Sequence, residues 1–405
     1  MRLSIIIPAY NEEGAISQII QRCLDAEQHI VAETPITEIE IIVVNDGSTD
    51  RTYEKAKIFR DFGKIHLVSY KTNRGYGAAI KRGFRRAAGD YVAFLDADGT
   101  CDPKYFTELF KNLEVNGADI SIGSRMGPGS QMPAVRRFGN RIYALLVSLI
   151  SSKRITDSAS GMRVIKKTAL KKLFPLPNGM NFTPAMSAKA VMIDDLKIVE
   201  TFMPYMERVG ESKLNVLKDG YGFLKTIVQI GLFYRPLKLF IFFAFIFAGI
   251  CLLYGVPLIF FYIKNQHLLQ ADIYRMITIL ISAILSVNIF FVGIAADEIV
   301  SIFSDKPIMY RRIKSRLIKS MLIPRNIMII GGSLMLSGIC LNYGTIVEYV
   351  RFGTIHVPWA YVVTGGFLVL MGAEMTMGAF MQKLLTMYKE SNDLKKNIDR
   401  QRDYL

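Results

Sequence analysis

The sequence predicts an α/β domain on a parallel sheet, followed by an all-α membrane domain of four helices. Over the first 235 residues or so, short β-branched runs alternate with helical patterns, as in parallel sheets covered by helices on both faces. Beyond residue 239, long uncharged apolar runs follow one another. A mean hydropathy of +0.27 with a net charge of +15 favours a membrane protein over a nucleic-acid binder, and 51% hydrophobic residues exclude a disordered chain.

The elements of the first domain are expected in a regular order. The strands are Leu3–Ile7, Ile39–Val44, Ile65–Ser69 and Tyr91–Leu95. The helices are Glu13–Glu27, Asp50–Phe62, Gly77–Ala88 and Pro103–Asn116. Ligands of such sheets bind at the carboxyl ends of the strands. Polar clusters occupy these ends at Pro8–Glu12, Asn45–Ser48 and Asp96–Asp98, so we expect the functional site there.

Four membrane spans are expected in the second half, at 239–263, 276–296, 327–347 and 357–381. The loop between the second and third spans is the basic one, with Lys306, Arg311, Arg312, Lys314, Arg316, Lys319 and Arg325. The next loop holds Arg351 as its only Lys or Arg. The positive-inside rule therefore predicts a cytosolic basic loop and cytosolic termini. Because Met1 and Arg2 run straight into the first expected strand, no signal peptide is expected before the first domain.

The expected domain boundaries are 1–213, catalytic; 214–238, amphipathic and juxtamembrane; 239–381, membrane-spanning; and 382–405, a charged cytosolic tail. Val135–Ile150 and Leu214–Arg235 mix basic and apolar residues, as helices on a membrane surface do. Packing against the sheet is the alternative for both. The four cysteines lie far apart and form no metal or disulfide pattern.

Asp96 and Asp98 stand two residues apart after an apolar strand. Two carboxylates are a hard oxygen site suited to Mg²⁺ or Mn²⁺, usually completed by water and phosphate oxygens. The alternative is a turn-forming pair before Gly99. Asp46 also ends a hydrophobic strand, where it can accept hydrogen bonds from a base or a ribose.

Five motifs occur in sequence order within about 125 residues: IIIPAYNEE, IIVVNDGSTD, NRGYGAAIKRG, GDYVAFLDADG and SIGSR. Together they resemble family 2 glycosyltransferases with the GT-A fold, which is a nucleotide-sugar-binding, Rossmann-like α/β fold. VRRFGNR, SGMRV and RVGESKL extend the resemblance to the dolichol-phosphate and polyprenol-phosphate sugar transferases, over residues 1–235.

The resemblance implies roles for individual residues. Its nucleotide-sugar contacts are Pro8, Tyr10, Glu12, Asp46, Asp96, Ala97 and Asp98. Its catalytic residues are Asp96, Asp98 and Arg125. Asp98 and Asp96 bind the metal, Mg²⁺ or Mn²⁺, and Thr100 stands where many relatives have a glutamine ligand. Its acceptor-phosphate residues are Arg125, Arg137, Arg208, Ser212 and Lys213.

The function expected on these grounds is that of an inverting glycosyltransferase, which moves one sugar from a UDP- or GDP-sugar to dolichyl or polyprenyl phosphate. The expected location is a prokaryotic cell membrane rather than the endoplasmic reticulum. Another acceptor, such as a glycosylated lipid or a polysaccharide, and a non-catalytic membrane sensor are the alternatives. A processive synthase is disfavoured because the only tryptophan, Trp359, is not part of a QxxRW motif. The sequence leaves the sugar and homo-oligomer formation open.

Overall fold

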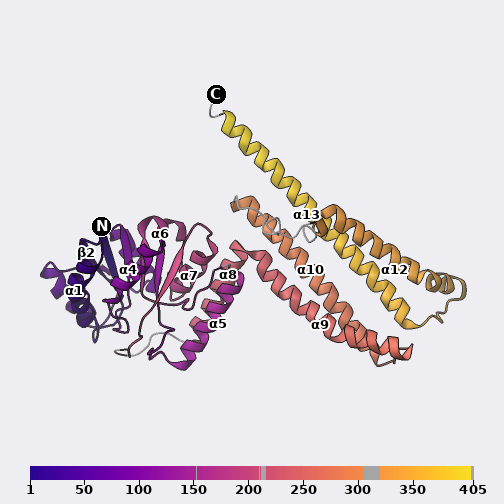
Figure 1. Cartoon of the computed structure of the whole chain (residues 1–405), viewed down its shortest axis with the longest axis horizontal. Coiled ribbons are helices and arrows are strands. Elements are labelled where there is room, and N and C mark those ends of the chain that lie inside the picture. Colours follow the sequence, from indigo (N-terminus) through magenta and orange to yellow (C-terminus); the bar gives the residue numbers. More distant parts are fainter. Residues whose placement is uncertain (152, 209, 211–215, 305–319, 403–405) are drawn as a thin grey trace. The chain divides into compact units, whose positions relative to one another are not determined.

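A computed structural model describes residues 1–151, 153–208, 210, 216–304 and 320–402 of the chain (Figure 1). The chain forms two compact units, Met1–Gly231 and Leu232–Leu405. The first unit contains a β-sheet and its covering helices, and the second is helical. The boundary expected after residue 213 falls among residues outside those described, and the first unit continues through most of helix α8 (Val216–Tyr234).

The first unit is built on one seven-stranded sheet in the order β3-β2-β1-β4-β6-β5-β7. The strands are β1 (Arg2–Ala9), β2 (Glu38–Asp46), β3 (His66–Tyr70), β4 (Tyr91–Phe94), β5 (Ile120–Ser124), β6 (Arg163–Lys166) and β7 (Ile198–Phe202). The four strands expected from the sequence are β1 to β4, and they are parallel to one another.

The sheet is mixed rather than parallel throughout. Strand β6 runs antiparallel to both neighbours, with Ala93 opposite Val164 and Ser121 opposite Val164 on its two edges. The strand has only four residues and follows a polar segment rather than a long apolar run, so its local pattern does not reveal its direction. As a result, the segment before β6 returns to the carboxyl end of β4.

Helices cover both faces of this sheet. They are α1 (Ile16–Glu33), α2 (Thr52–Asp61), α3 (Tyr76–Arg86), α4 (Tyr105–Val115), α5 (Ala134–Ile150), α6 (Lys167–Leu173), α7 (Phe182–Met192) and α8. Successive side chains of β1 point to opposite faces of the sheet and so pack against the helices on both faces. Leu3 and Ile5 belong to the buried core under α1 and α4, whereas Ile6 meets α3 at Gly83, where an added Cβ would lie 2.4 Å from the Ile6 Cγ2.

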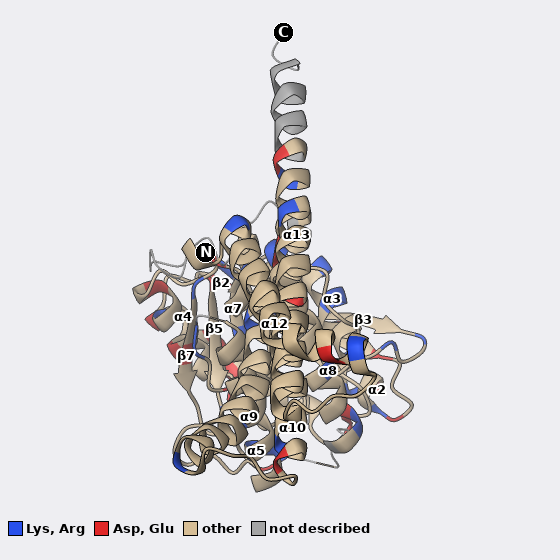
Figure 2. Cartoon of the chain, turned by 90° about the vertical axis from the view of Figure 1, so that its right-hand side faces the viewer, with Lys and Arg blue, Asp and Glu red and all other residues tan. Residues whose placement is uncertain are grey.

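The second unit contains four long helices among its described residues, α9 (Pro236–Asn265), α10 (Asp272–Ser304), α12 (Pro324–Phe352) and α13 (Trp359–Arg402). All four are long and apolar enough to cross a membrane. Helices α9, α10 and α12 contain the first three predicted spans, and α13 contains the fourth from Trp359 onward. Figure 2 shows long stretches of these helices without Lys, Arg, Asp or Glu. Helix α9 packs on α10 and α12 on α13, while α10 also contacts α13. Most of the basic loop, residues 305–319, lies outside the described residues.

Candidate active site

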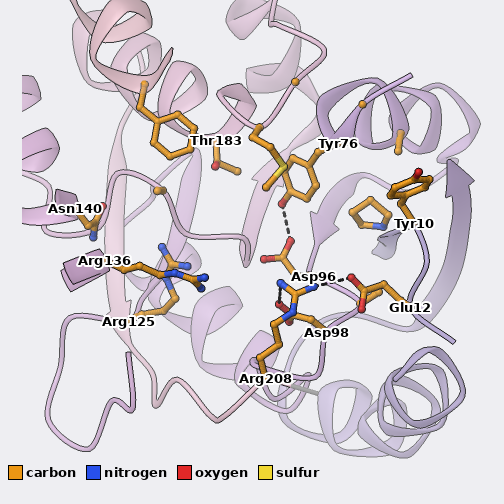
Figure 3. A pocket seen from close by; sticks show the side chains of 18 of the residues that line it. Tyr10, Glu12, Tyr76, Asp96, Asp98, Arg125, Arg136, Asn140, Thr183 and Arg208 are labelled. Carbon is orange, nitrogen blue, oxygen red and sulfur yellow. Dashed lines mark hydrogen bonds and ion pairs between the residues drawn. The ribbon is translucent and has the colours of Figure 1, made fainter. Parts of the chain in front are cut away.

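The carboxyl ends of β1, β2 and β4 open into one cavity of about 460 Å³. These strands are neighbours in the sheet and parallel, so the segments that follow them meet at one edge. All seven residues predicted to contact the nucleotide sugar line this cavity: Pro8, Tyr10, Glu12, Asp46, Asp96, Ala97 and Asp98. Figure 3 shows several of them facing one another. The sequence thus located the cavity; the contacts within it had to come from the structure.

Asp46 is buried and holds the next loop in place. Its two carboxylate oxygens accept hydrogen bonds from the backbone N–H groups of Arg74 (2.9 Å) and Gly75 (2.8 Å). Burial raises the pKa of Asp46, although these two hydrogen bonds favour the carboxylate. Gly75 has a φ of +101° and lines the cavity, where a left-handed backbone favours glycine. Asp46 therefore shapes the loop that borders the cavity, and its contact with a base or ribose stays a prediction.

Asp96 is held from two sides. The Tyr76 hydroxyl donates a 2.7 Å hydrogen bond to its Oδ1 (Figure 3). On the other side its carboxylate lies against Gly161, where an added Cβ would be 2.1 Å from Oδ2. Burial, together with the neighbouring charge of Asp98, raises the pKa of Asp96. Both supporting residues come from motifs that the sequence singled out, NRGYG and SGMRV, but neither was expected to contact Asp96.

Asp98 divides its two oxygens between support and the cavity. Its Oδ1 accepts hydrogen bonds from the Thr100 backbone N–H (3.1 Å) and hydroxyl (2.7 Å). Its Oδ2 lies 3.1 Å from Nη1 of Arg208. Thr100 is buried and does not line the cavity. The Thr100 hydroxyl thus orients the Asp98 carboxylate, and its role as a metal ligand stays a prediction.

Arg208 bridges two carboxylates. One guanidinium nitrogen lies 2.7 Å from Glu12 Oε1 and the other is the one that contacts Asp98 (Figure 3). The segment that carries Arg208 is tied to the same loop, because the Met206 N–H donates a 2.9 Å hydrogen bond to the Thr100 carbonyl. This arginine, expected from the sequence to meet the acceptor phosphate, thus stands on the carboxylate side of the cavity.

Arg125 lines the cavity with its charge compensated from behind. Its Nε and Nη2 donate hydrogen bonds of 2.8 and 2.9 Å to the two oxygens of Asp157, whose side chain is fully buried. The guanidinium carbon also lies 5.7 Å from the centre of the Tyr205 ring. Burial raises the pKa of Asp157, but the opposite charge of Arg125 and the hydrogen bonds to the carboxylate outweigh burial. The pKa of Asp157 therefore lies below its usual value. Asp157 is thus ionised and fixes the orientation of Arg125.

Asp157 belongs to a buried network that the sequence did not predict. It also accepts a 3.0 Å hydrogen bond from Nδ2 of Asn140 on α5, a second residue that lines the cavity. Asn140 Oδ1 in turn accepts from the Ser158 N–H and hydroxyl. The backbone N–H of Asp157 donates to Glu200 on β7. A signal was present, a run of small polar residues ending in SGMRV, but it does not reveal long-range partners.

The remaining acceptor-phosphate predictions have mixed outcomes. Arg137 does not line the cavity, since its Nη2 donates a 2.7 Å hydrogen bond to the Ser130 carbonyl. Its neighbour Arg136 lines the cavity instead (Figure 3). The two point differently because adjacent positions of a helix lie about 100° apart. Ser212 and Lys213 lie outside the described residues.

The carboxylates fit a divalent cation. Among the described residues no cluster of three or more His, Cys, Asp or Glu side chains is arranged to hold a metal. Glu12 and Asp98 nevertheless converge on a single positive group, the Arg208 guanidinium. Oxygen ligands of this kind suit Mg²⁺ or Mn²⁺, which take their other ligands from water and phosphate. Asp98, with Glu12 and Asp96 beside it, is therefore the part of the cavity that would hold the metal.

Gly161→Ala should lower the rate of the sugar transfer expected from the sequence about a hundredfold. The added Cβ forces the Asp96 carboxylate to move by roughly 1 Å. Gly222→Ala on α8 is the matched control, since nothing lies within 4 Å of its added Cβ. Initial rates of the two purified variants, measured beside their thermal unfolding, test this. Equal rates for both variants would show that the Asp96 position is not critical.

Residues 4–174 match the family model described as glycosyl transferase family 2, and residues 235–396 match one described as a domain of unknown function, DUF8752. Low-salt glycan biosynthesis hexosyltransferase Agl6 of Haloferax volcanii is 34% identical over 56% of this chain and 53% of its own. Dolichol-phosphate mannosyltransferase of Pyrococcus furiosus is 29% identical over 57% of this chain and 64% of its own. A dolichyl-phosphate beta-glucosyltransferase of Drosophila melanogaster is 33% identical over 43% and 57%. The chain thus spans about half to two thirds of the length of these relatives.

Among solved structures, glucosyl-3-phosphoglycerate synthase of Mycobacterium tuberculosis in complex with Mn²⁺, UDP and glucosyl-3-phosphoglycerate aligns with a TM-score of 0.41 and 19% identity. The alignment covers 56% of this chain and 79% of the synthase chain. A similarity this low adds nothing to the assignment. Residues 4–174 contain every strand-end carboxylate of the cavity, Glu12, Asp46, Asp96 and Asp98. Residues 4–174 of this chain therefore form a domain that matches the glycosyl transferase family 2 model and is built on a mixed α/β sheet.

Proposed function

We propose that the chain transfers one sugar from a nucleotide sugar to a polyisoprenyl phosphate at a membrane surface, with a divalent cation at Asp98. The observation that carries this proposal is that carboxylates and arginines share one cavity. Asp96 and Asp98 lie beside the strand ends, while Arg125 and Arg136 line the same space from β5 and α5. The relatives named for dolichyl-phosphate sugar transfer support the same reaction class.

The donor occupies the strand-end side of the cavity in this proposal. Pro8 and Tyr10 border the base, and Gly75 lets the loop approach the ribose and diphosphate. A cation held at Asp98 would compensate the charge that builds on the leaving nucleoside diphosphate. Asp96 remains fixed by Tyr76 next to the sugar.

The acceptor supplies its own nucleophile. The second pKa of a phosphate monoester is near 6, so a lipid phosphate carries a reactive oxyanion at neutral pH and needs no general base. In the proposed step this oxygen forms a bond to the anomeric carbon from the side opposite the diphosphate. The bond to the diphosphate breaks, and the nucleoside diphosphate leaves with the electron pair. An α-linked donor thereby gives a β-linked product.

Arginines position the phosphate rather than activate it. Arg125 is fixed by Asp157, so it presents its planar cation without the entropy cost of ordering a mobile side chain. Arg136 on α5 lines the same wall of the cavity. Lys213 and Ser212, on the segment after Arg208, remain predicted acceptor contacts.

An apolar stripe next to the cavity supports a membrane-bound acceptor. Along α5 the exposed residues follow helical spacing: Val135, Phe138, Ile142, Leu145 and Leu149. On α8, Leu217, Tyr221 and Leu224 are exposed in the same way. The two helices are joined, since the Tyr143 hydroxyl donates to the Gly220 carbonyl and its ring meets Phe223 edge-on. Such a stripe, with Arg136 and Arg141 on the same helix, suits a lipid headgroup boundary.

Chain continuity agrees with that placement. Helix α8 ends at Tyr234, and the first helix able to span a membrane begins at Pro236. The end of α8 therefore adjoins the bilayer when α9 spans it. By the positive-inside rule, the basic loop supports a cytosolic location for this surface.

Leu145→Trp tests the membrane face of α5 directly. With Trp359, the only native tryptophan, replaced by Phe, the new indole reports its own surroundings. In nanodiscs with acyl-chain-brominated lipid we expect its fluorescence to be quenched relative to unbrominated lipid, because interfacial helices sink roughly 5–10 Å toward the acyl chains. Val115→Trp, at an exposed apolar site on α4, is the control and should not be quenched. Equal quenching at both sites would contradict the proposed face.

The proposed reaction is tested by a donor screen on the purified full chain in detergent. Each radiolabelled UDP- or GDP-sugar is mixed with Mg²⁺ or Mn²⁺ and a short polyprenyl or dolichyl phosphate. We expect one donor to place one labelled sugar per lipid in the organic phase. Nucleotide binding with no transfer to any lipid phosphate would overturn the acceptor and favour a glycosylated lipid or polysaccharide in its place.

A further inference from the structure

Arg208 occupies the position between carboxylates where a metal ion would be expected. Its guanidinium touches Glu12 Oε1 at 2.7 Å and Asp98 Oδ2 at 3.1 Å. The other Asp98 oxygen is already used by Thr100. The oxygen that Asp98 presents to the cavity is therefore the one that carries Arg208 (Figure 3). A divalent cation and this guanidinium would compete for the same atom.

The arginine is also incompletely satisfied in this position. Its Nε is buried and has no hydrogen-bond partner among the residues that the structure describes. A guanidinium has five N–H donors, and its planar fork matches phosphate oxygens as well as carboxylates. In this position the Nε–H group of Arg208 can still donate a hydrogen bond to a second partner.

Its backbone remains close to the site wherever the side chain points. The Met206 N–H is bonded to the Thr100 carbonyl, and the Met203 N–H to the Ser124 carbonyl. The side chain can therefore leave Asp98 without the segment leaving the cavity. Movement of the guanidinium alone would bring it onto a phosphate bound beside the metal.

We infer that Arg208 is the resident counter-ion of the metal-free donor site, and that the metal with its nucleotide displaces it from Asp98 onto phosphate. This rests on the proposed function and specifies its regulation. Binding of the donor with its metal thus moves this guanidinium from the Asp98 carboxylate to the diphosphate. The nucleotide and the metal therefore bind cooperatively, because a diphosphate offers Arg208 a new partner and so clears Asp98 for the metal.

The test is Mn²⁺ binding by the full-length protein in detergent, followed by the EPR signal of free Mn²⁺. Arg208→Gln is expected to bind Mn²⁺ alone about tenfold more tightly than the unaltered chain, a shift equivalent to about 1.4 kcal/mol. UDP or GDP should raise Mn²⁺ affinity more in the unaltered chain than in Arg208→Gln. Sugar transfer should fall in the same variant. A tighter metal with slower transfer is not expected of a residue that serves only the fold.

Two further variants make the outcome decisive. Arg60→Gln removes one surface arginine paired with Asp61, outside the cavity, and should leave Mn²⁺ affinity unchanged. Arg208→Lys keeps the positive charge but lacks the planar guanidinium, so its Mn²⁺ affinity should lie between those of the unaltered chain and Arg208→Gln. This variant keeps the test valid if Arg208→Gln does not fold. Equal or weaker Mn²⁺ binding by folded Arg208→Gln would overturn this inference and leave metal dependence standing. Absence of Mn²⁺ binding from every variant and from the unaltered chain would overturn both.

Discussion

Asp98→Asn is expected to lower sugar transfer about a thousandfold while the protein remains folded. Asparagine keeps the shape of the side chain, and its Oδ1 can still accept the hydrogen bonds from Thr100. What it loses is the charged Oδ2, the oxygen that faces Arg208 and the proposed metal. A metal that compensates a leaving diphosphate contributes several kcal/mol to the transition state, and about 4 kcal/mol corresponds to three powers of ten in rate.

Transfer should be measured over a titration of Mn²⁺ and Mg²⁺, with nucleotide binding followed separately. Asp102→Asn is the matched control, because Asp102 stands four residues further on and meets Arg22 outside the cavity. We expect it to retain normal rates. Undiminished transfer by Asp98→Asn at saturating metal would sink the metal assignment, whereas activity restored only by a large excess of metal would fit a weakened site.

The sequence predicted the part of the fold that local patterns determine. Strands β1 and β2 have strong β-branched runs, β4 is a short apolar run, and polar residues follow each of the three, so their carboxyl ends could be identified in advance. The four spans were equally clear, because a membrane helix must satisfy its backbone within an apolar run. Strands β5, β6 and β7 were not predicted, and the direction of β6 could not be, because it depends on pairing with strands distant in the sequence.

The supporting contacts of the site could not be read from the sequence. Asp157 is separated from Arg125 by 32 residues, and Tyr76 from Asp96 by 20, so no local spacing links them. Arg136 and Arg137 look alike in the sequence, and only the orientation of α5 decides which one faces the cavity. The hydrogen bond from Thr100 to Asp98 was likewise not evident, because a hydroxyl at that position can meet a metal or a carboxylate equally well.

Asp157→Ala should both destabilise the first unit and stop transfer. It leaves the Arg125 guanidinium buried without its counter-ion, and breaking a buried pair in this way costs about 3–5 kcal/mol of unfolding free energy. It also removes the partner of Asn140, so two cavity residues lose their positions. Thermal and denaturant unfolding give the stability, and the lipid-phosphate assay gives the rate.

The double variant Asp157→Leu with Arg125→Met separates the two effects. An apolar pair of similar volume avoids the orphaned charge, so stability should return to within about 1–2 kcal/mol of the unaltered chain. Transfer should not return, because the proposed phosphate contact at Arg125 is gone. Recovery of both together would mean that this ion pair serves only the fold.

The pH dependence of stability gives an independent check on the ionised Asp157. Its pKa in the folded chain lies below the ordinary value of 3.8, since attraction by Arg125 and the hydrogen bonds outweigh burial. A depressed carboxylate pKa contributes stability above the unfolded pKa and loses it as the pH falls through the folded value. The difference in stability between the unaltered chain and Asp157→Asn should therefore be constant at neutral pH and shrink as the pH falls below about 3.8. A difference that does not change over this acid range would contradict an ionised Asp157, and Arg125 would then lack the anionic partner that fixes its orientation in the proposed phosphate site.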